Sequence, residues 1–261
     1  MLTDYHMHTS FSPDSQFDMD DEIRCAIEKK IQEICFTDHV DHNILVNQDC
    51  PLKEYRMRYE ACKEKYQHQI VLKWGAEFGV QTHTVPLFQK DFDMYDFDFI
   101  ILSCHQIQDL EFWNQQFQKG KSQKEINEAY YQEIYQCMQL YKDYSVLGHL
   151  DAIKRDDPYG EYKDDQIEDI LMEILKKAIS DGKGIEVNTS NFRYHLSDLT
   201  PSRKILKMYY DLGGKILTFG SDTHQKEHVG YKIEEVKEIV KDMGFKEFVT
   251  FEKMKPIFHL L

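Results

Sequence analysis

The chain has no long apolar run. No stretch approaches the roughly 18–20 consecutive apolar residues that a membrane-spanning helix needs, so the sequence predicts no membrane association. The first informative motif begins at residue 6, which leaves no room before it for a cleaved signal peptide or transit segment, and we expect a cytoplasmic location. The hydrophobic fraction of 41% and the charged fraction of 30% are typical of a globular protein rather than a disordered one.

Paired cysteines are also missing. The six cysteines are scattered along the chain, and no two of them stand in a Cys-x-x-Cys arrangement. This spacing indicates neither a zinc ribbon nor a disulfide framework, and we expect reduced cysteines packed among apolar neighbours.

The chain carries no lysine-rich block, and its formal net charge is −14. A general nucleic-acid binder needs a basic surface, so we predict no nucleic-acid partner. A small anionic substrate stays compatible with this charge, because bound divalent ions and one or two arginines reverse the field locally.

Linkers and low-complexity segments are absent as well, so we predict one domain that spans residues 1–261. Short apolar runs alternate with longer amphipathic ones. The runs typical of strands cover residues 5–8, 33–37, 70–77, 97–105, 145–148, 184–188 and 215–220. The runs typical of helices cover about residues 19–31, 52–66, 123–144, 164–181, 201–212 and 233–243. We expect a loop over residues 80–96, and Thr200 as the N-cap of a helix that begins at Pro201.

This alternation predicts the fold class. Strands that alternate with helices form parallel sheets with right-handed crossovers. Seven such units in 261 residues fit a closed α/β barrel better than two open sheets.

Candidate ligand residues stand where the predicted strands end, which is where barrel enzymes place their chemistry. Six of the 12 histidines lie at such ends. Two groups spaced i, i+2 on a strand point to the same face, so His6 and His8 are expected to converge while Met7 packs on the other side. The ends read His6-Met7-His8, Thr37-Asp38-His39, Gly75-Ala76-Glu77, Ser103-Cys104-His105, Gly148-His149-Leu150-Asp151, Glu186-Val187-Asn188 and Ser221-Asp222-Thr223-His224. Because candidate ligand residues recur at one predicted strand end after another, the sequence predicts a metal site.

In this order the blocks resemble the PHP (polymerase and histidinol phosphatase) family, from Asp4 to His224. The resemblance implies a single-domain, distorted (β/α)7 barrel of TIM-like form that holds two to three divalent metal ions (Zn, Mn or Fe). The ligands it implies are His6, His8, Asp14, His39, Glu77, His105, His149, Asp222 and His224. Many family members have histidine where Asp14 stands, and the harder carboxylate favours iron or manganese there.

The chain is similar to the monofunctional family members, which implies hydrolysis of L-histidinol phosphate to L-histidinol and phosphate in histidine biosynthesis. The expected nucleophile is a hydroxide that bridges two metal ions, and the expected partner is a small-molecule phosphate ester. Arg155 and Arg193 follow strand ends by a few residues, and guanidinium groups suit phosphate binding, so we predict that both bind the phosphate.

Three alternatives stay open. The same metal centre could serve another phosphomonoesterase or a phosphodiesterase acting on nucleotides. A zinc amidohydrolase of similar architecture would need a bridging lysine at a strand end, and no lysine is so placed. A non-catalytic metal-binding module is the alternative from a different class. The oligomeric state is left undetermined.

Several further residues have weaker assignments. Asp38 either orients an imidazole or caps a helix, and Glu186 and Asn188 either orient a ligand or contact substrate. Thr9, Ser10 and Ser12 are interpreted as turn formers. The remaining histidines are expected at the surface, with His83 and His195 near the mouth of the site, and Asp109 and Glu111 are candidates to meet a cationic substrate group.

Overall fold

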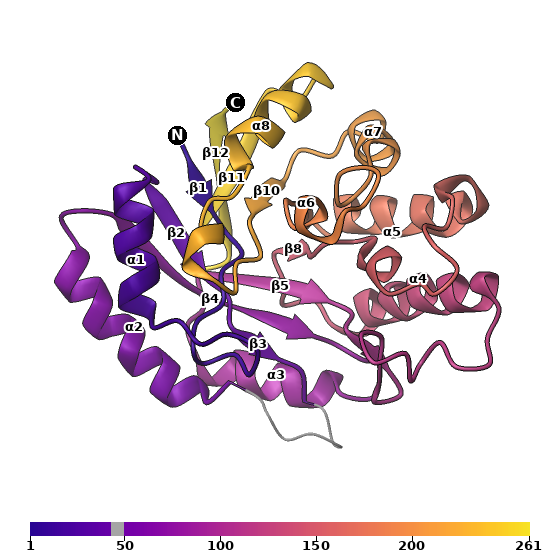
Figure 1. The fold of residues 1–261 in the computed structure, drawn as a ribbon, viewed down its shortest axis with the longest axis horizontal. Helices are drawn as coiled ribbons and strands as arrows, with labels where there is room; N and C mark the ends of the chain where they lie inside the picture. The colour runs from indigo at the N-terminus through magenta and orange to yellow at the C-terminus, as the bar shows by residue number, and fades with distance from the viewer. Residues whose placement is uncertain (43–49) are drawn as a thin grey trace.

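The computed structural model describes residues 1–42 and 50–261 (Figure 1). Within these residues eight strands form one parallel sheet, in the order β1-β2-β4-β5-β8-β9-β10 with β3 paired beside β4. Every strand pair in this sheet is parallel, as the alternation of strands and helices predicts. The strands are β1 (Thr3–Asp4), β2 (Glu33–Phe36), β3 (His39–Val40), β4 (Val71–Gly79), β5 (Phe99–Ser103), β8 (Val146–Leu147), β9 (Gly184–Asn188) and β10 (Leu217–Gly220).

The sheet curls until its two edges meet. The amide of Tyr5 donates a 2.9 Å hydrogen bond to the carbonyl of Phe219, and Met7 forms a parallel bridge with Thr223. These contacts join the segment after β1 to β10, so the sheet is nearly closed. The prediction of a distorted (β/α)7 barrel is confirmed.

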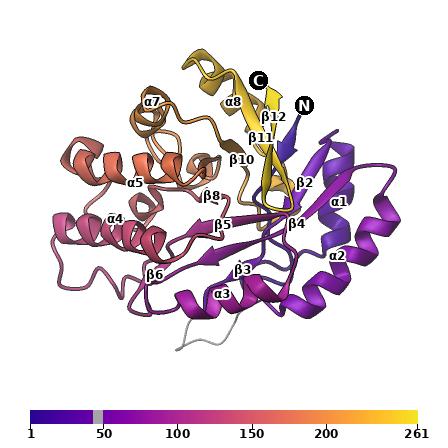
Figure 2. The same cartoon turned by 180° about the vertical axis from the view of Figure 1, so that it is seen from behind.

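Helices surround the strands (Figures 1 and 2). The helix α5 illustrates why: Leu171, Ile174, Leu175 and Ala178 follow one another at helical spacing and are all buried. The helices are α1 (Met19–Glu28), α2 (Leu52–Tyr66), α3 (Val85–Met94), α4 (Gln123–Leu140), α5 (Glu168–Ser180), α6 (Asn191–Tyr194), α7 (Arg203–Asp211) and α8 (Ile233–Asp242). Three 3-10 helices also occur: η1 (Ala152–Arg155), η2 (Asp164–Gln166) and η3 (Lys226–His228). No helix in the described part of the chain has the length and apolar character needed to cross a membrane.

Two antiparallel hairpins complete the structure. One consists of β6 (Gln106–Ile107) and β7 (Leu110–Glu111), and the other of β11 (Glu247–Glu252) and β12 (Lys255–Leu260). Val249 and Phe251 of β11 pack with Tyr5, Phe99 and Val146, and Phe99 and Val146 are the first residues of β5 and β8. The second hairpin therefore covers the barrel at the end opposite to the candidate site.

The structure corrects three expectations. Residues 80–96 are not one loop, because Val85, Phe88 and Phe92 lie on one face of α3 and pack on the core. Thr200 is not an N-cap: α7 begins at Arg203, and the hydroxyl of Ser202 accepts a hydrogen bond from the amide of Ile205. The strand expected at residues 5–8 lies earlier in the chain: β1 spans Thr3–Asp4, and of the following residues Met7 forms an isolated bridge with Thr223. None of the six cysteines, all of which lie in the described residues, is in a disulfide, in agreement with the prediction of reduced cysteines.

Candidate metal centre

The carboxylate of Glu77 is the meeting point of the candidate site. Glu77 lies near the end of β4 and is fully buried, and its Oε1 accepts a 2.6 Å hydrogen bond from the hydroxyl of Ser103. Five imidazoles reach it from four other segments: residues 6–8, His39, His105 and His149. Its oxygens lie 3.2 Å from Nε2 of His6, 3.5 Å from Nε2 of His8, 2.9 Å from Nδ1 of His39, 3.2 Å from Nε2 of His105 and 2.8 Å from Nε2 of His149.

Asp222 is a second carboxylate on the opposite side of His6 and His8. Its Oδ1 lies 3.7 Å from Nε2 of His6, 3.6 Å from Nε2 of His8 and 3.6 Å from Nδ1 of His224. The backbone of Asp222 adopts a positive φ of 55°, and its amide donates to the carbonyl of His6. This left-handed turn at the end of β10 directs the carboxylate toward the first strand.

Asp14 lies at the outer side of the cluster. Its Oδ2 is 3.1 Å from Nε2 of His224 and 3.6 Å from Nε2 of His39, and its side chain is 55% exposed. The rings of His8, His39 and His224 lie against one another, with centroid distances of 4.1 Å from His8 to His39, 4.2 Å from His8 to His224 and 5.7 Å from His39 to His224. All nine predicted ligand residues therefore lie in one cluster.

Within this cluster, four sets of three ligand atoms lie within 4.8 Å of one another. The described residues form the sets His8/His39/His224, His6/His149/Asp222, His6/His8/Glu77 and His39/Glu77/His105. Asp14 belongs to none of these sets. Overlapping sets that share Glu77 suit several neighbouring ions better than a single one.

The residues present fit a divalent cation. Nε2 of His6, Nε2 of His8, Nδ1 of His39 and Oε2 of Glu77 are buried without a hydrogen-bond partner. Burying polar atoms unpaired costs free energy, and a cation among them accepts their lone pairs. Imidazole nitrogens mixed with carboxylate oxygens are the donors that zinc, manganese and iron bind.

The carboxylates and imidazoles of the cluster set one another's protonation. Burial alone raises the pKa of Glu77, but His6, His105 and His39 outweigh it and hold this pKa well below its usual range. Burial, reinforced by His39 and His224, holds the pKa of His8 well below the usual value for histidine. Glu77 is therefore ionised and His8 is neutral, the forms that bind metal, whereas the carboxylates raise the pKa of His6, His39 and His105 despite burial, and these imidazoles must release a proton before they bind a cation.

Side chains behind the imidazoles orient them. Oε1 of Glu186 lies 2.6 Å from Nδ1 of His6, and Oδ1 of Asp41 lies 2.7 Å from Nδ1 of His105. The hydroxyl of Ser12 lies 3.1 Å from Nδ1 of His8. In each case the partner holds Nδ1, so that Nε2 faces the centre of the cluster.

Asp38 holds the segment that carries Thr9 and Ser12. It accepts hydrogen bonds from the amide of Thr9 at 2.7 Å and from the hydroxyl of Ser12 at 2.7 Å, and it caps no helix. Ser12 is therefore more than a turn former, since it connects Asp38 to His8. Sequence reasoning also missed Asp41 and Ser103. For Asp41 the only signal was its i, i+2 spacing from His39.

Both predicted arginines contact Asp222. Arg155 donates from Nη2 to Oγ of Ser190 at 2.5 Å and to Oδ2 of Asp222 at 3.3 Å, while its Nε is buried without a partner. Arg193 donates from Nη1 to the carbonyl of Ser221 at 2.8 Å and from Nη2 to that of Asp222 at 2.7 Å. The structure thus brings both guanidinium groups to the cluster.

The remaining histidines lie elsewhere. Nε2 of His83 is 3.2 Å from Oδ1 of Asp109, which also accepts a hydrogen bond from Gln81. His195 ends α6 in a left-handed conformation. Neither histidine joins the clustered ligand sets found in the described residues. Contacts of these residues with substrate stay a prediction.

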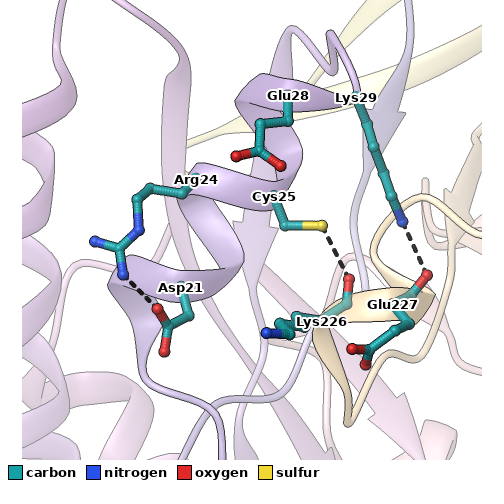
Figure 3. A pocket seen from close by; sticks show the side chains of 7 residues that line it. All are labelled: Asp21, Arg24, Cys25, Glu28, Lys29, Lys226 and Glu227. Carbon is teal, nitrogen blue, oxygen red and sulfur yellow. Dashed lines mark hydrogen bonds and ion pairs between the residues drawn. The ribbon is translucent and has the colours of Figure 1, made fainter.

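The loop that carries His224 is anchored to α1. Sγ of Cys25 donates to the carbonyl of Lys226, and Nζ of Lys29 donates to the carbonyl of Glu227 at 2.8 Å (Figure 3). The same ammonium donates to the carbonyl of Val229 at 2.8 Å. A surface pocket of about 490 Å³ lies beside this anchor, outside the metal centre.

The fold and this site together define a class of protein, the distorted barrels with a candidate metal centre of histidines and carboxylates at the carboxyl ends of the strands. The model of the PHP domain family matches residues 4–190. This match covers more than half of the chain, and the chain belongs to the PHP domain family.

Relatives of nearly equal length support the same grouping. The histidinol-phosphatase of Lactococcus lactis subsp. lactis (strain IL1403) is 31% identical over 259 residues, which cover 97% of this chain and 95% of the relative. The probable histidinol-phosphatase of Clostridium acetobutylicum is 30% identical over 262 residues, covering 97% of this chain and 98% of the relative.

Solved structures have the same fold. The Lactococcus lactis histidinol phosphate phosphatase, crystallised with zinc, L-histidinol and phosphate, superposes with a TM-score of 0.91 at 30% identity and 98% coverage of each chain. A putative histidinol phosphatase from Listeria monocytogenes superposes with a TM-score of 0.76 at 18% identity, covering 89% of this chain and 99% of its own, which supports the fold alone.

Proposed function

We propose that the protein hydrolyses L-histidinol phosphate to L-histidinol and phosphate, as a cytoplasmic enzyme of histidine biosynthesis. The observation that carries this proposal is the convergence of five imidazoles on buried Glu77, in a chain whose fold matches a structure with bound zinc, L-histidinol and phosphate. A small-molecule phosphate ester as the substrate is also consistent with the net charge of −14, which disfavours the binding of nucleic acid.

The nine clustered residues would hold two to three divalent ions, zinc, manganese or iron. The three-residue sets around Glu77 and Asp222 supply two neighbouring positions. His8, His39 and His224 supply a third position. Asp14 would complete it, since its Oδ2 lies 3.1 Å from Nε2 of His224 and 3.6 Å from Nε2 of His39. When bound, such ions polarise a phosphoryl oxygen and make a coordinated water more acidic.

The protein's own groups would position the phosphate. The guanidinium group of Arg155 is 11% exposed, and its Nε has no partner. A charged N–H donor such as Nε suits a hydrogen bond to a phosphate oxygen. Arg193 uses one N–H of each terminal nitrogen for a carbonyl, and the second N–H of each stays available for a phosphate oxygen.

The first test is phosphate release by metal-stripped protein that has been reloaded with zinc, manganese or iron. We would compare histidinol phosphate, a generic aryl phosphate and an aryl phosphodiester. A strong preference for histidinol phosphate that depends on metal is expected. Hydrolysis of the diester, or equal rates with both monoesters, would keep the metal chemistry and refute the assigned substrate.

A variant controls for contaminating phosphatases. Glu77→Gln removes the charge on which five imidazoles converge, and we expect activity to fall by at least about a hundredfold together with metal content. The matched control is Glu247→Gln, an exposed position on β11. Full activity in Glu77→Gln would contradict the proposed centre.

A further inference from the structure

Lys154 is a buried lysine that lies outside the metal cluster. It is 8% exposed, and its ammonium lies 2.9 Å from Oδ2 of Asp151 and 2.7 Å from Oδ1 of Asp164. Both carboxylate side chains are also largely buried. Removing three charges from water costs free energy, so such a triad adds little to the stability of the fold. It does hold the three side chains in a defined arrangement.

The triad ties three separate segments together. Asp151 precedes η1, Asp164 begins η2, and Ser202 caps α7. The amide of Ser202 donates to Oδ2 of Asp151 at 3.1 Å, and its hydroxyl donates to Oδ2 of Asp164. The position of η1 is thereby fixed against the start of α7.

Arg155 is the next residue along η1, and its side chain makes a different set of contacts. Its guanidinium donates to Ser190 and Asp222 and lies 4.6 Å from the centre of the Tyr194 ring. The helix η1 has only four residues, and 3-10 helices this short have little stability of their own. Tertiary anchors must therefore orient it.

A second anchor holds the other end of η1. The side-chain amides of Gln115 and Gln118 donate to the carbonyl of Asp156 at 2.8 Å and 3.1 Å. These bonds fix where the helix ends, while the Lys154 triad fixes its start against η2 and α7. The triad therefore fixes the geometry of η1, whose last residue, Arg155, contacts Asp222 of the metal cluster.

We propose that Lys154, through Asp151 and Asp164, is a positioning residue that holds Arg155 in the orientation that binds the phosphate of the substrate. This inference rests on the proposed phosphatase function. The triad itself contacts neither metal nor phosphate. Its loss is expected to weaken phosphate binding while the metal ligands stay in place.

The test measures inhibition by inorganic phosphate, together with KM and kcat for the phosphate ester, in metal-loaded protein. Arg155→Ala is expected to raise the inhibition constant by about tenfold or more, the size of a lost charge-assisted hydrogen bond. Lys154→Met is expected to raise the inhibition constant and KM by about five- to tenfold, with kcat changed by less than about threefold. Metal content, measured by elemental analysis, should equal that of the unmodified protein.

The double variant Lys154→Met/Arg155→Ala separates positioning from general damage. If Lys154 acts through Arg155, the double variant should match Arg155→Ala within about twofold, because coupled residues are not additive. Lys204→Met is the matched control. Lys204 also bridges to carboxylates at η2 and α5, but it is partly exposed and should leave all constants unchanged.

Asp164→Asn decides the question if Lys154→Met does not fold, since it preserves shape and weakens the same triad. We expect a rise of about threefold in the phosphate inhibition constant. An unchanged constant in a folded triad variant, lost metal, or a full additional loss in the double variant would overturn the inference. An unchanged constant in Arg155→Ala would instead overturn the phosphate role of Arg155.

Discussion

Glu186 and His6 form a buried pair across 180 residues of sequence, with Nδ1 of His6 2.6 Å from Oε1 of Glu186. The other carboxylate oxygen of Glu186 accepts a 2.8 Å hydrogen bond from the amide of His149. One side chain on β9 thus orients a candidate ligand after β1 and fixes the backbone of another after β8. Its effect is to direct Nε2 of His6 toward Glu77.

Replacing Glu186 tests this role. Glu186→Ala frees Nδ1 of His6, and partners behind metal-binding imidazoles contribute about 10–100-fold in metal affinity or activity. We expect weaker metal retention in a chelator titration, with activity recovered in excess metal. Unchanged retention in the folded variant would show that the Glu186 contact does not orient a ligand.

The absence of a side chain at Gly79 is a second requirement of the site. A Cβ at this position would overlap Oδ1 of Asp41 and lie 2.8 Å from Nδ1 of His105. Gly79→Ala should therefore separate Asp41 from His105 and lower metal affinity by about tenfold or more. Metal content and thermal unfolding should be measured together. A variant with normal metal content and normal activity would contradict this account.

Asp20, which is not one of the nine candidate ligands, allows a prediction about how the stability of the fold depends on pH. Although burial opposes it, hydrogen bonds from Lys65, Tyr66 and Arg58 lower the pKa of Asp20 from 3.8 to about 2. A carboxyl whose pKa is lower in the folded state stabilises the fold above its unfolded pKa, and this contribution disappears as the pH falls toward the folded pKa.

Asp20→Asn should accordingly cost about 1–2 kcal/mol of unfolding free energy at pH 6. The difference from the unmodified protein should shrink as the pH falls from about 4 toward 2. Urea unfolding at several pH values measures both. A difference that does not change between pH 6 and pH 3 would exclude the ionised carboxylate as its cause.

Lys29 links α1 to the loop that follows His224 (Figure 3). Lys29→Met removes hydrogen bonds to the carbonyls of Glu227 and Val229, at an expected cost of about 1–2 kcal/mol. The variant should also show faster proteolysis near residues 224–229. The exposed neighbour Lys30→Met is the control and should behave like the unmodified protein. Equal stability of both variants would show that the anchor is dispensable.

Local pattern predicted the barrel and a metal site at the strand ends, and the resemblance to the PHP family implied which nine residues are its ligands. Strand ends are followed by closely spaced pairs such as Asp222 and His224, which the short separation along the chain keeps near each other even though Asp222 lies in a left-handed turn. Parallel strands align their carboxyl ends at one edge, so a series of local motifs predicts one shared site. The helix α3 is hard to detect from the sequence because the exposed apolar residues Leu87 and Met94 fall outside the period of Val85, Phe88 and Phe92 and obscure it.

The tertiary structure alone decided how these residues cooperate. Glu186 reaches His6, Asp41 reaches His105 and Arg193 reaches the carbonyl of Asp222, and each pair is joined across tens of residues or more. Spacing along the chain carries no information about such contacts, because they depend on how strands and loops far apart in sequence pack together. The sequence by itself determined which chemistry gathers at the strand ends, and long-range packing decided which side chain orients which ligand.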